Sequence, residues 1–212
     1  MKTTALDGLL IGSCVLALVA LSTLTVLALP SAGTYRVIID AAVFLLAYGV
    51  YTMILLALLR KRWPYPHGTF SMDSGAFTWW KLNAVLVDLA SKALSPYRLV
   101  FTESLLHAGF GATVRSQTAI AGVLRDHPML EIDERATIGQ NSVITAHAIT
   151  GDVIVIKPIR IGRSAVVGVN CVVMPGVELG ERAVLAPGAV AIVDTKIPAN
   201  ELWGGIPARK IR

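Results

Sequence analysis

Charged residues are scarce in this chain, and their scarcity argues against two classes of protein. Only 16% of the 212 residues are Asp, Glu, Lys or Arg, whereas average soluble domains carry about 25%. Hydrophobic residues make up 54% of the sequence. A disordered chain needs low hydrophobicity and many charges, so disorder is excluded, and a wholly soluble protein is disfavoured.

Cysteine and histidine are also rare. Cys14 and Cys171 are too few and too far apart to suggest a disulfide framework, and a reducing compartment fits them equally well. The sequence has no Cys-x-x-Cys motif, glycine-rich phosphate loop or serine nucleophile elbow. The four histidines form no close pair of metal ligands, so we expect no bound metal; they are His67, His107, His127 and His147.

Two N-terminal blocks hold most of the apolar excess. Residues 8–29 contain no charge, and residues 37–59 contain only Asp40. Each block has about the 20 residues that a helix needs to cross the hydrocarbon core of a membrane. Turn-forming residues at 30–33 join the blocks, so we expect a transmembrane helical hairpin over residues 1–62.

Basic residues indicate the orientation of this hairpin. Arg60, Lys61 and Arg62 follow the second block, whereas the connecting loop offers only Arg36. By the positive-inside rule, the chain after the second helix is cytoplasmic, and so is the N-terminus with Lys2, at a bacterial-type inner or plasma membrane. A cleaved signal peptide is the alternative for the first block, and it also leaves the C-terminal part cytoplasmic.

Residues 63–107 are expected to form a linker followed by two amphipathic helices. Prolines and glycines mark the linker, and apolar residues then recur at helical spacing over 76–93 and 96–107. Trp79 and Trp80 suit the headgroup level, so we expect these helices to lie in the membrane interface. Packing against the following domain is the alternative, and the two arrangements are compatible.

The formal net charge of +5 fits a membrane better than a nucleic acid. Lys81, Lys92 and Arg98 lie in the expected interfacial helices, where they can meet anionic lipids. The basic residues do not cluster with exposed aromatic residues, as nucleic-acid binding would require.

The C-terminal half, residues 108–212, repeats every six residues. An aliphatic residue recurs at this spacing in two registers, and the residue four positions later is small or apolar. The first register comprises Val114, Ile120, Ile132, Ile138 and Ile144, with Asp126 as its one exception; the second comprises Val155, Ile161, Val167, Val173, Leu179, Leu185, Ala191 and Ile197.

A spacing of six fits neither an α-helix nor a simple hairpin, but it fits short strands separated by sharp turns. Three such strands close one triangular coil, and stacked coils share a continuous core. Gly162, Gly168 and Gly180 follow the aliphatic position, where we expect glycine to relieve the turn. Asp126 begins the sequence Asp-His-Pro, which indicates a loop at a corner.

The repeat resembles that of the hexapeptide-repeat acyltransferases, whose fold is a left-handed parallel β-helix. The resemblance covers about residues 108–212 and is most specific at Gly204–Arg212, because many acetyltransferases of this family close with Gly-x-Pro-Ala-Lys/Arg. The stretch from Trp79 through His147 also resembles the membrane-attached C-terminal domains of poly-lysine-synthetase-like peptide synthetases. Those domains have transmembrane helices, a Trp-Trp pair and a histidine before a register break.

The two registers do not join, and the break between them holds the candidate catalytic residue. Ile144 and Val155 are eleven residues apart, one short of two hexads, and interruptions of solenoids often carry binding functions. His147 lies in this interval, three positions after the inward Ile144 and therefore at a corner. A neutral imidazole can take the proton from a hydroxyl or amine that attacks a thioester.

The resemblance also assigns the role of general base to His147, while an exposed histidine without chemistry is the alternative. His127 is a second, weaker candidate. An acid would orient the base. Asp152 follows His147 by five residues, and Glu131 and Asp133 precede it by about one coil. The sequence does not choose among the three acids, and a backbone carbonyl could serve instead.

The resemblance implies acetyl-CoA or another acyl-CoA as co-substrate, and a homotrimer with active sites shared between subunits. In the family, basic residues near the C-terminus meet the CoA phosphates. The corresponding residues here are Arg209, Lys210 and Arg212, while Gly188 and Gly205 would let the pantetheine arm approach the backbone. A basic tail that is solvated, or that touches lipid, is the alternative.

Together these features predict a membrane-bound acyltransferase that moves an acetyl or other acyl group from CoA to a hydroxyl or amine. The acceptor would be membrane-associated: a lipid-linked sugar, a lipid amine or a peptide delivered by a carrier protein. Two alternatives stay open. One is an aminoacyl or peptidyl transferase that uses a carrier-protein thioester, and the other is a non-enzymatic trimeric membrane scaffold.

Overall fold

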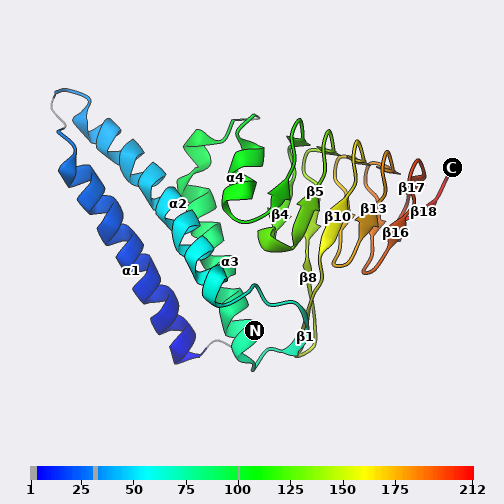
Figure 1. Ribbon diagram of the computed structural model, residues 1–212, viewed down its shortest axis with the longest axis horizontal. Helices are drawn as coiled ribbons and strands as arrows, with labels where there is room; N and C mark the ends of the chain where they lie inside the picture. The colour runs from blue at the N-terminus through cyan, green and yellow to red at the C-terminus, as the bar shows by residue number, and fades with distance from the viewer. Residues whose placement is uncertain (1–3, 31–32, 100) are drawn as a thin grey trace. The chain divides into compact units, whose positions relative to one another are not determined.

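The computed structural model describes residues 4–30, 33–99 and 101–212, which form two compact units. The first unit runs to Tyr65 and resumes over Asp73–Arg98; the second comprises Pro66–Met72 and Leu99–Arg212. Figure 1 shows the helices of the first unit and the coiled strands of the second. Lys2 and the loop residues Ser31 and Ala32, which entered the predicted topology, lie outside the described residues.

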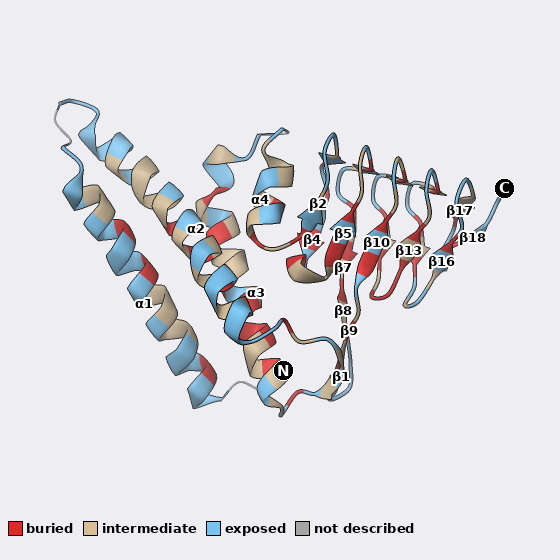
Figure 2. Cartoon of the chain, viewed as in Figure 1, coloured by how far each residue is buried: buried red, intermediate tan, exposed pale blue. Residues whose placement is uncertain are grey.

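Two helices of the first unit are long and apolar enough to cross a membrane. They are α1 (Ala5–Ala28) and α2 (Arg36–Arg62), each a few residues longer than the predicted blocks. At the start of α1, the Thr4 and Asp7 side chains accept hydrogen bonds from each other's backbone N–H groups, a capping box that satisfies two otherwise unpaired donors. Most of the side chains of both helices are exposed or only partly buried, as Figure 2 shows.

A third helix, α3 (Gly75–Ala93), packs on α1 and α2 and corrects one expectation. Lys81 was expected to meet lipid headgroups, but its side chain is buried and pairs with the carboxylate of Asp7. The Lys81 ammonium also lies 4.7 Å from the centre of the Phe77 ring. A buried charge needs such a partner, so this contact fixes α3 to the start of α1.

The second predicted amphipathic helix, 96–107, is not one continuous helix. The structure has a 3₁₀-helix η1 (Ser95–Tyr97) and a separate α4 (Glu103–Gly109), which belong to different units. Pro96 lies at the start of η1, and proline suits the first turn of a helix because its missing N–H has no intrahelical partner there.

The predicted left-handed parallel β-helix is confirmed, with three sheets of stacked short strands. The first sheet contains β2 (Thr113–Val114), β5 (Leu130–Ile132), β10 (Ile159–Ile161), β13 (Glu178–Leu179) and β16 (Lys196–Ile197). The second contains β3 (Ala119–Ile120), β6 (Thr137–Ile138), β11 (Val166–Val167), β14 (Val184–Leu185), β17 (Leu202–Gly204) and the antiparallel β18 (Arg209–Lys210). The third contains β4 (Val123–Arg125), β7 (Val143–Thr145), β12 (Val172–Val173) and β15 (Val190–Ala191).

The hexads supply the core of this β-helix. Every aliphatic residue of the two registers from Ile120 onwards is buried, apart from Val155, and Figure 2 shows these buried residues within the stacked coils. The residue three positions after an aliphatic one adopts a left-handed backbone conformation at ten corners. These corner residues are Gln117, Arg135, Asn141, Ser164, Asn170, Gly176, Arg182, Gly188, Asp194 and Asn200.

The glycines that follow the aliphatic positions have a different role from the predicted one. Gly162, Gly168 and Gly180 are absent from the residues with positive φ, so they do not relieve the turn. A Cβ atom on any of them would lie less than 3.0 Å from backbone atoms of the next coil. Glycine is required there because the coils stack closely, and the left-handed conformation occurs two positions later.

Replacing Gly168 with alanine tests this account. The new Cβ would lie 2.6 Å from the nitrogen of Pro187 and 2.8 Å from the carbonyl oxygen of Leu185, and backbone atoms cannot move aside as a side chain can. We expect Gly168→Ala to lower the free energy of unfolding by about 1–3 kcal/mol, measured by thermal denaturation of the purified protein. Gly75→Ala is the control, since no atom lies within 4 Å of its added Cβ; equal melting of both variants would contradict the close-packing role.

The break between the registers is an inserted β-hairpin. Ile132 pairs with Ile161 and Ile144 pairs with Val173, so one hexad should separate Ile144 from Ile161, yet they are seventeen residues apart. The additional residues form β8 (His147–Thr150) and β9 (Val153–Ile156), which are antiparallel and leave the coil as an arm (Figure 1). Val155 therefore lies in this arm and not in the aliphatic column.

The expected linker contributes a third strand to the arm. β1 (Gly68–Ser71) pairs antiparallel with β9, with Gly68 opposite Ile156 and Ser71 opposite Val153. The order of the small sheet is β1-β9-β8. The prolines and glycines of this segment predicted a loop. The four-residue strand is stabilised by its pairing with β9, which is distant in the sequence, so composition alone could not predict it.

Candidate active site

His147 is the first residue of β8, at the point where the chain leaves the coil. Its side chain is 25% exposed, so the imidazole is held by the fold and still open to solvent. Corner residues in this position, such as Asn141 and Asn170, adopt a left-handed conformation, but His147 does not, because the chain continues there into the hairpin. The inserted arm thus determines where this imidazole lies.

A buried carboxylate contacts the ring of His147. The distance between His147 Nδ1 and Asp126 Oδ2 is 2.5 Å, and the Asp126 side chain is only 3% exposed. Thr145 Oγ1 also lies 3.1 Å from Nδ1. If Nδ1–H donates to the carboxylate, the lone pair lies on Nε2, which is the nitrogen that can accept a proton from a substrate.

The fold brings Asp126 to this position through a corner of the preceding coil. Leu124 pairs with Ile144 and occupies the interior, so Asp126 falls at the following corner. Its φ angle of 58° places it in the left-handed region, where aspartate is tolerated better than most residues. It precedes the 3₁₀-helix η2 (His127–Met129), and the Asp126 carbonyl accepts a hydrogen bond from Met129 N at 2.8 Å.

The acid at His147 Nδ1 is therefore none of the three that sequence reasoning offered. Glu131 accepts a hydrogen bond from Arg160 Nε at 3.0 Å, and Asp133 Oδ1 lies 3.3 Å from Arg115 Nε. Asp152 lies at the turn between β8 and β9, where its carbonyl accepts from Met72 N. The signal for the actual partner was in the sequence: Asp126 is the one polar residue in the aliphatic register.

The other histidines occupy different environments. His127 is buried against His107, with 2.9 Å between His107 Nδ1 and His127 Nε2. This burial disfavours His127, the second candidate, as a base for an external acceptor. His67 is exposed before β1.

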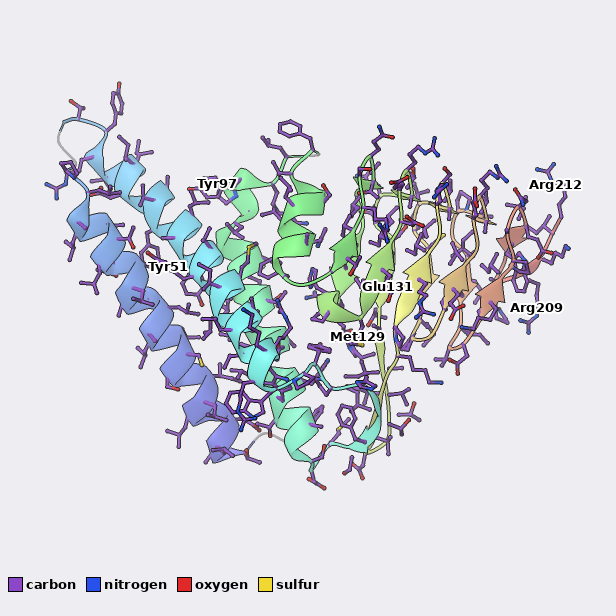
Figure 3. All side chains as sticks on the ribbon, in the orientation of Figure 1. Tyr51, Tyr97, Met129, Glu131, Arg209 and Arg212 are labelled. Atoms are coloured by element: carbon purple, nitrogen blue, oxygen red, sulfur yellow. The ribbon has the colours of Figure 1, made fainter. Side chains whose placement is uncertain are left out.

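The candidate CoA-binding residues lie towards the C-terminal end of the β-helix. Gly188 and Gly205 are exposed and have positive φ angles of 74° and 90°. Arg209 and Arg212 project from the end of the solenoid, as Figure 3 shows. Lys210 Nζ lies 2.5 Å from Glu201 Oε1, and this contact lowers the pKa of the Glu201 carboxyl. The structure does not bring any of these residues to His147, which lies in an earlier coil.

Two further features concern metals and thiols. Within residues 4–30, 33–99 and 101–212, no group of three or more His, Cys, Asp or Glu is arranged to hold a metal ion. Cys171 lies at a small inward position, where burial raises the pKa of its thiol and its sulfur donates to the Ala186 carbonyl at 3.0 Å. Its environment is that of a packing residue and not of a nucleophile.

The repeat and the fold define the class of this domain. Residues 158–191 match the protein-family model described as "bacterial transferase hexapeptide (six repeats)". A solved hexapeptide-repeat-containing acetyltransferase from Vibrio cholerae, in complex with acetyl coenzyme A, has a TM-score of 0.53 and 24% identity, over 73% of this chain and 96% of that chain. The resemblance to the hexapeptide-repeat transferases is thereby confirmed, and this structural similarity establishes the fold.

Two curated relatives are similar to parts of this chain in sequence. The chain is 42% identical over 55 residues to the 2,3,4,5-tetrahydropyridine-2,6-dicarboxylate N-acetyltransferase of Enterococcus faecalis, which is 26% of this chain and 23% of that enzyme. It is 26% identical over 172 residues to the delta-poly-L-ornithine synthetase of Acinetobacter baumannii, which is 79% of this chain and 12% of the synthetase. The matches thus span a quarter or less of each relative's length.

Proposed function

We propose that the protein is a membrane-bound acyltransferase that moves an acyl group, with acetyl as the leading candidate, from CoA to a hydroxyl or amine. The observation that carries the proposal is the 2.5 Å contact between His147 and the buried Asp126 at the inserted hairpin. A base held by a carboxylate is the arrangement that activates a weak nucleophile. The similarity to acetyltransferases supplies the reaction class.

The proposed reaction needs no covalent enzyme intermediate, because a thioester is already activated. His147 Nε2 takes the proton from the acceptor O–H or N–H as the acceptor atom bonds to the acyl carbon. The Asp126 carboxylate stabilises the imidazolium that forms. The tetrahedral intermediate then expels the CoA thiolate, which takes the proton from His147, so that the products are the acylated acceptor and free CoA.

The C-terminal basic residues would hold the phosphates of CoA. We expect the double variant Arg209→Ala, Arg212→Ala to weaken acetyl-CoA binding by about tenfold, because two exposed charges leave the phosphate site. Calorimetry on the detergent-solubilised protein measures this, with Arg163→Ala as a matched control outside the C-terminal segment. The wild type and the double variant should differ less in their affinity for dephospho-acetyl-CoA than in their affinity for acetyl-CoA. If the double variant binds acetyl-CoA as tightly as the wild type, these residues do not belong to the CoA site.

The similarity to the poly-ornithine synthetase favours a second candidate, transfer from a carrier-protein thioester. Both candidates use the same base, and they differ only in the donor. Solubilised protein is offered acetyl-CoA or an aminoacyl carrier protein together with a panel of amines and sugar hydroxyls. Release of free CoA with formation of an acetylated acceptor supports the first candidate, whereas turnover of the carrier thioester alone supports the second.

Two long apolar helices support a membrane location for the protein. α1 and α2 expose large aliphatic side chains along their length, among them Leu16 and Leu27 on α1 and Val37 on α2, which lipid would cover. The basic residues that end α2 would place the catalytic domain on the cytoplasmic side, where acyl-CoA is found. The acceptor would then be a lipid-linked or otherwise membrane-associated hydroxyl or amine, and the enzyme a homotrimer, as in the resembled family.

A further inference from the structure

A buried pair of histidines adjoins the acid that contacts His147, because one of them, His127, directly follows Asp126 in the chain. His107 and His127 are 5% and 4% exposed, and their rings lie nearly parallel, with an angle of 23° between the planes. The distance from His107 Nδ1 to His127 Nε2 is 2.9 Å. The proposed mechanism uses neither ring, although both are titratable groups in a protected site.

His127 contacts one side chain of helix α4, that of His107, and the ring of the helix's C-cap residue, Phe110. Glu103 and His107 are one helical turn apart, and Glu103 Oε2 lies 3.3 Å from His107 Nε2. The Phe110 ring is 5.3 Å from the His127 ring. The contacts of the His127 ring with His107 and Phe110 thus hold η2 against α4 and its C-cap residue.

The anchored residue is the immediate neighbour of Asp126. Asp126 adopts the left-handed backbone conformation that recurs at the corners of this β-helix, so the residues that follow this corner help to set its position. The His107–His127 contact fixes the first residue of η2, and the bond from Met129 N to the Asp126 carbonyl fixes its last. Between them, these contacts set where the Asp126 carboxylate meets His147.

We propose that His107 and His127 are positioning residues for the acyl transfer, acting through Asp126 on His147. The inference rests on the proposed function, because it assigns a role in that same reaction. Their effect is on the alignment of the base, and neither residue touches donor or acceptor.

The test compares three replacements of His127 in the full-length, solubilised protein. His127→Leu removes the contact to His107 and should lower kcat by about 10- to 100-fold while leaving the KM for acetyl-CoA unchanged. His127→Gln keeps a polar group near the position of Nε2 and should retain most of kcat at neutral pH. His127→Asn keeps an amide but is one bond too short to reach His107 Nδ1, so it should lose kcat as His127→Leu does, with the KM for acetyl-CoA unchanged.

The outcomes separate this inference from the proposed function. If His127→Leu keeps kcat within twofold of the wild type, or if His127→Gln loses as much kcat as His127→Leu, the positioning role is wrong. Should His127→Leu fail to fold, the comparison of His127→Asn with His127→Gln decides the question: equal kcat values in these two variants would contradict the positioning role. Full activity of His147→Ala would instead overturn the proposed function itself, whatever the His127 variants do; His67→Gln, an exposed histidine, is the matched control.

Discussion

His147→Ala is expected to lower kcat for acyl transfer by about 10²–10⁴-fold, the usual contribution of a general base. The variant removes the Nε2 lone pair that takes the acceptor's proton. The side chain is partly exposed at the start of β8, so its loss should leave the hydrophobic core of the β-helix intact. Steady-state release of CoA, measured with a thiol reagent on solubilised protein, gives kcat and the KM for acetyl-CoA separately.

Whether His147→Ala changes kcat or the KM for acetyl-CoA is as informative as the size of the loss in kcat. Since the base acts on the acceptor during the chemical step, kcat should fall while acetyl-CoA binding stays nearly the same. His67→Ala, which changes an exposed histidine in the same unit, should keep wild-type kinetics. If His147→Ala membranes retain full transfer activity, the imidazole is not the base.

Asp126→Asn has the second largest expected effect, a loss of kcat of about 10²–10³-fold. The amide removes the negative charge that stabilises the imidazolium of His147, and its NH₂ group can reverse the direction of the hydrogen bond to Nδ1. Reversal would place the ring proton on Nε2, where a base needs a lone pair. Rapid-quench measurement of a single turnover with saturating acetyl-CoA isolates this effect on chemistry.

The matched controls for Asp126 are the acids that sequence reasoning proposed. Asp152→Asn changes a turn residue of the hairpin, and Glu131→Gln changes a partner of Arg160, so both should leave kcat within about twofold. A loss in either control as large as that of Asp126→Asn would show that the contact at Nδ1 does not define the catalytic acid.

The β-helix was predictable from the sequence because its repeat is local. Each hexad carries its own inward aliphatic residue and small partner, so neighbouring residues already specify the coil; Ile161, Val167 and Val173 all proved to be buried. The position of His147 at a break in the repeat followed from counting alone. The reason for the glycines did not, because the close contact of Gly168 with Pro187 joins two different coils.

The partners in the site were not predictable because they depend on contacts between distant segments. Asp126 and His147 are 21 residues apart, and only the pairing of β4 with β7 brings them together. β1 is a four-residue segment that forms a strand only against β9, so a local pattern cannot identify it. The inserted hairpin shifts the register between Ile144 and Ile161, so spacing in the sequence no longer measures distance along the sheet there.

The most direct test of the account is an experimental structure of the full-length protein with CoA bound. A base within about 2.6–3.2 Å of the acceptor atom, which itself lies about 3–3.5 Å from the acyl carbon, requires the thioester to reach the ring. We predict the CoA sulfur within about 6 Å of His147 Nε2, allowing for these two contacts. A sulfur bound far from His147 would contradict the assignment of this residue as the base.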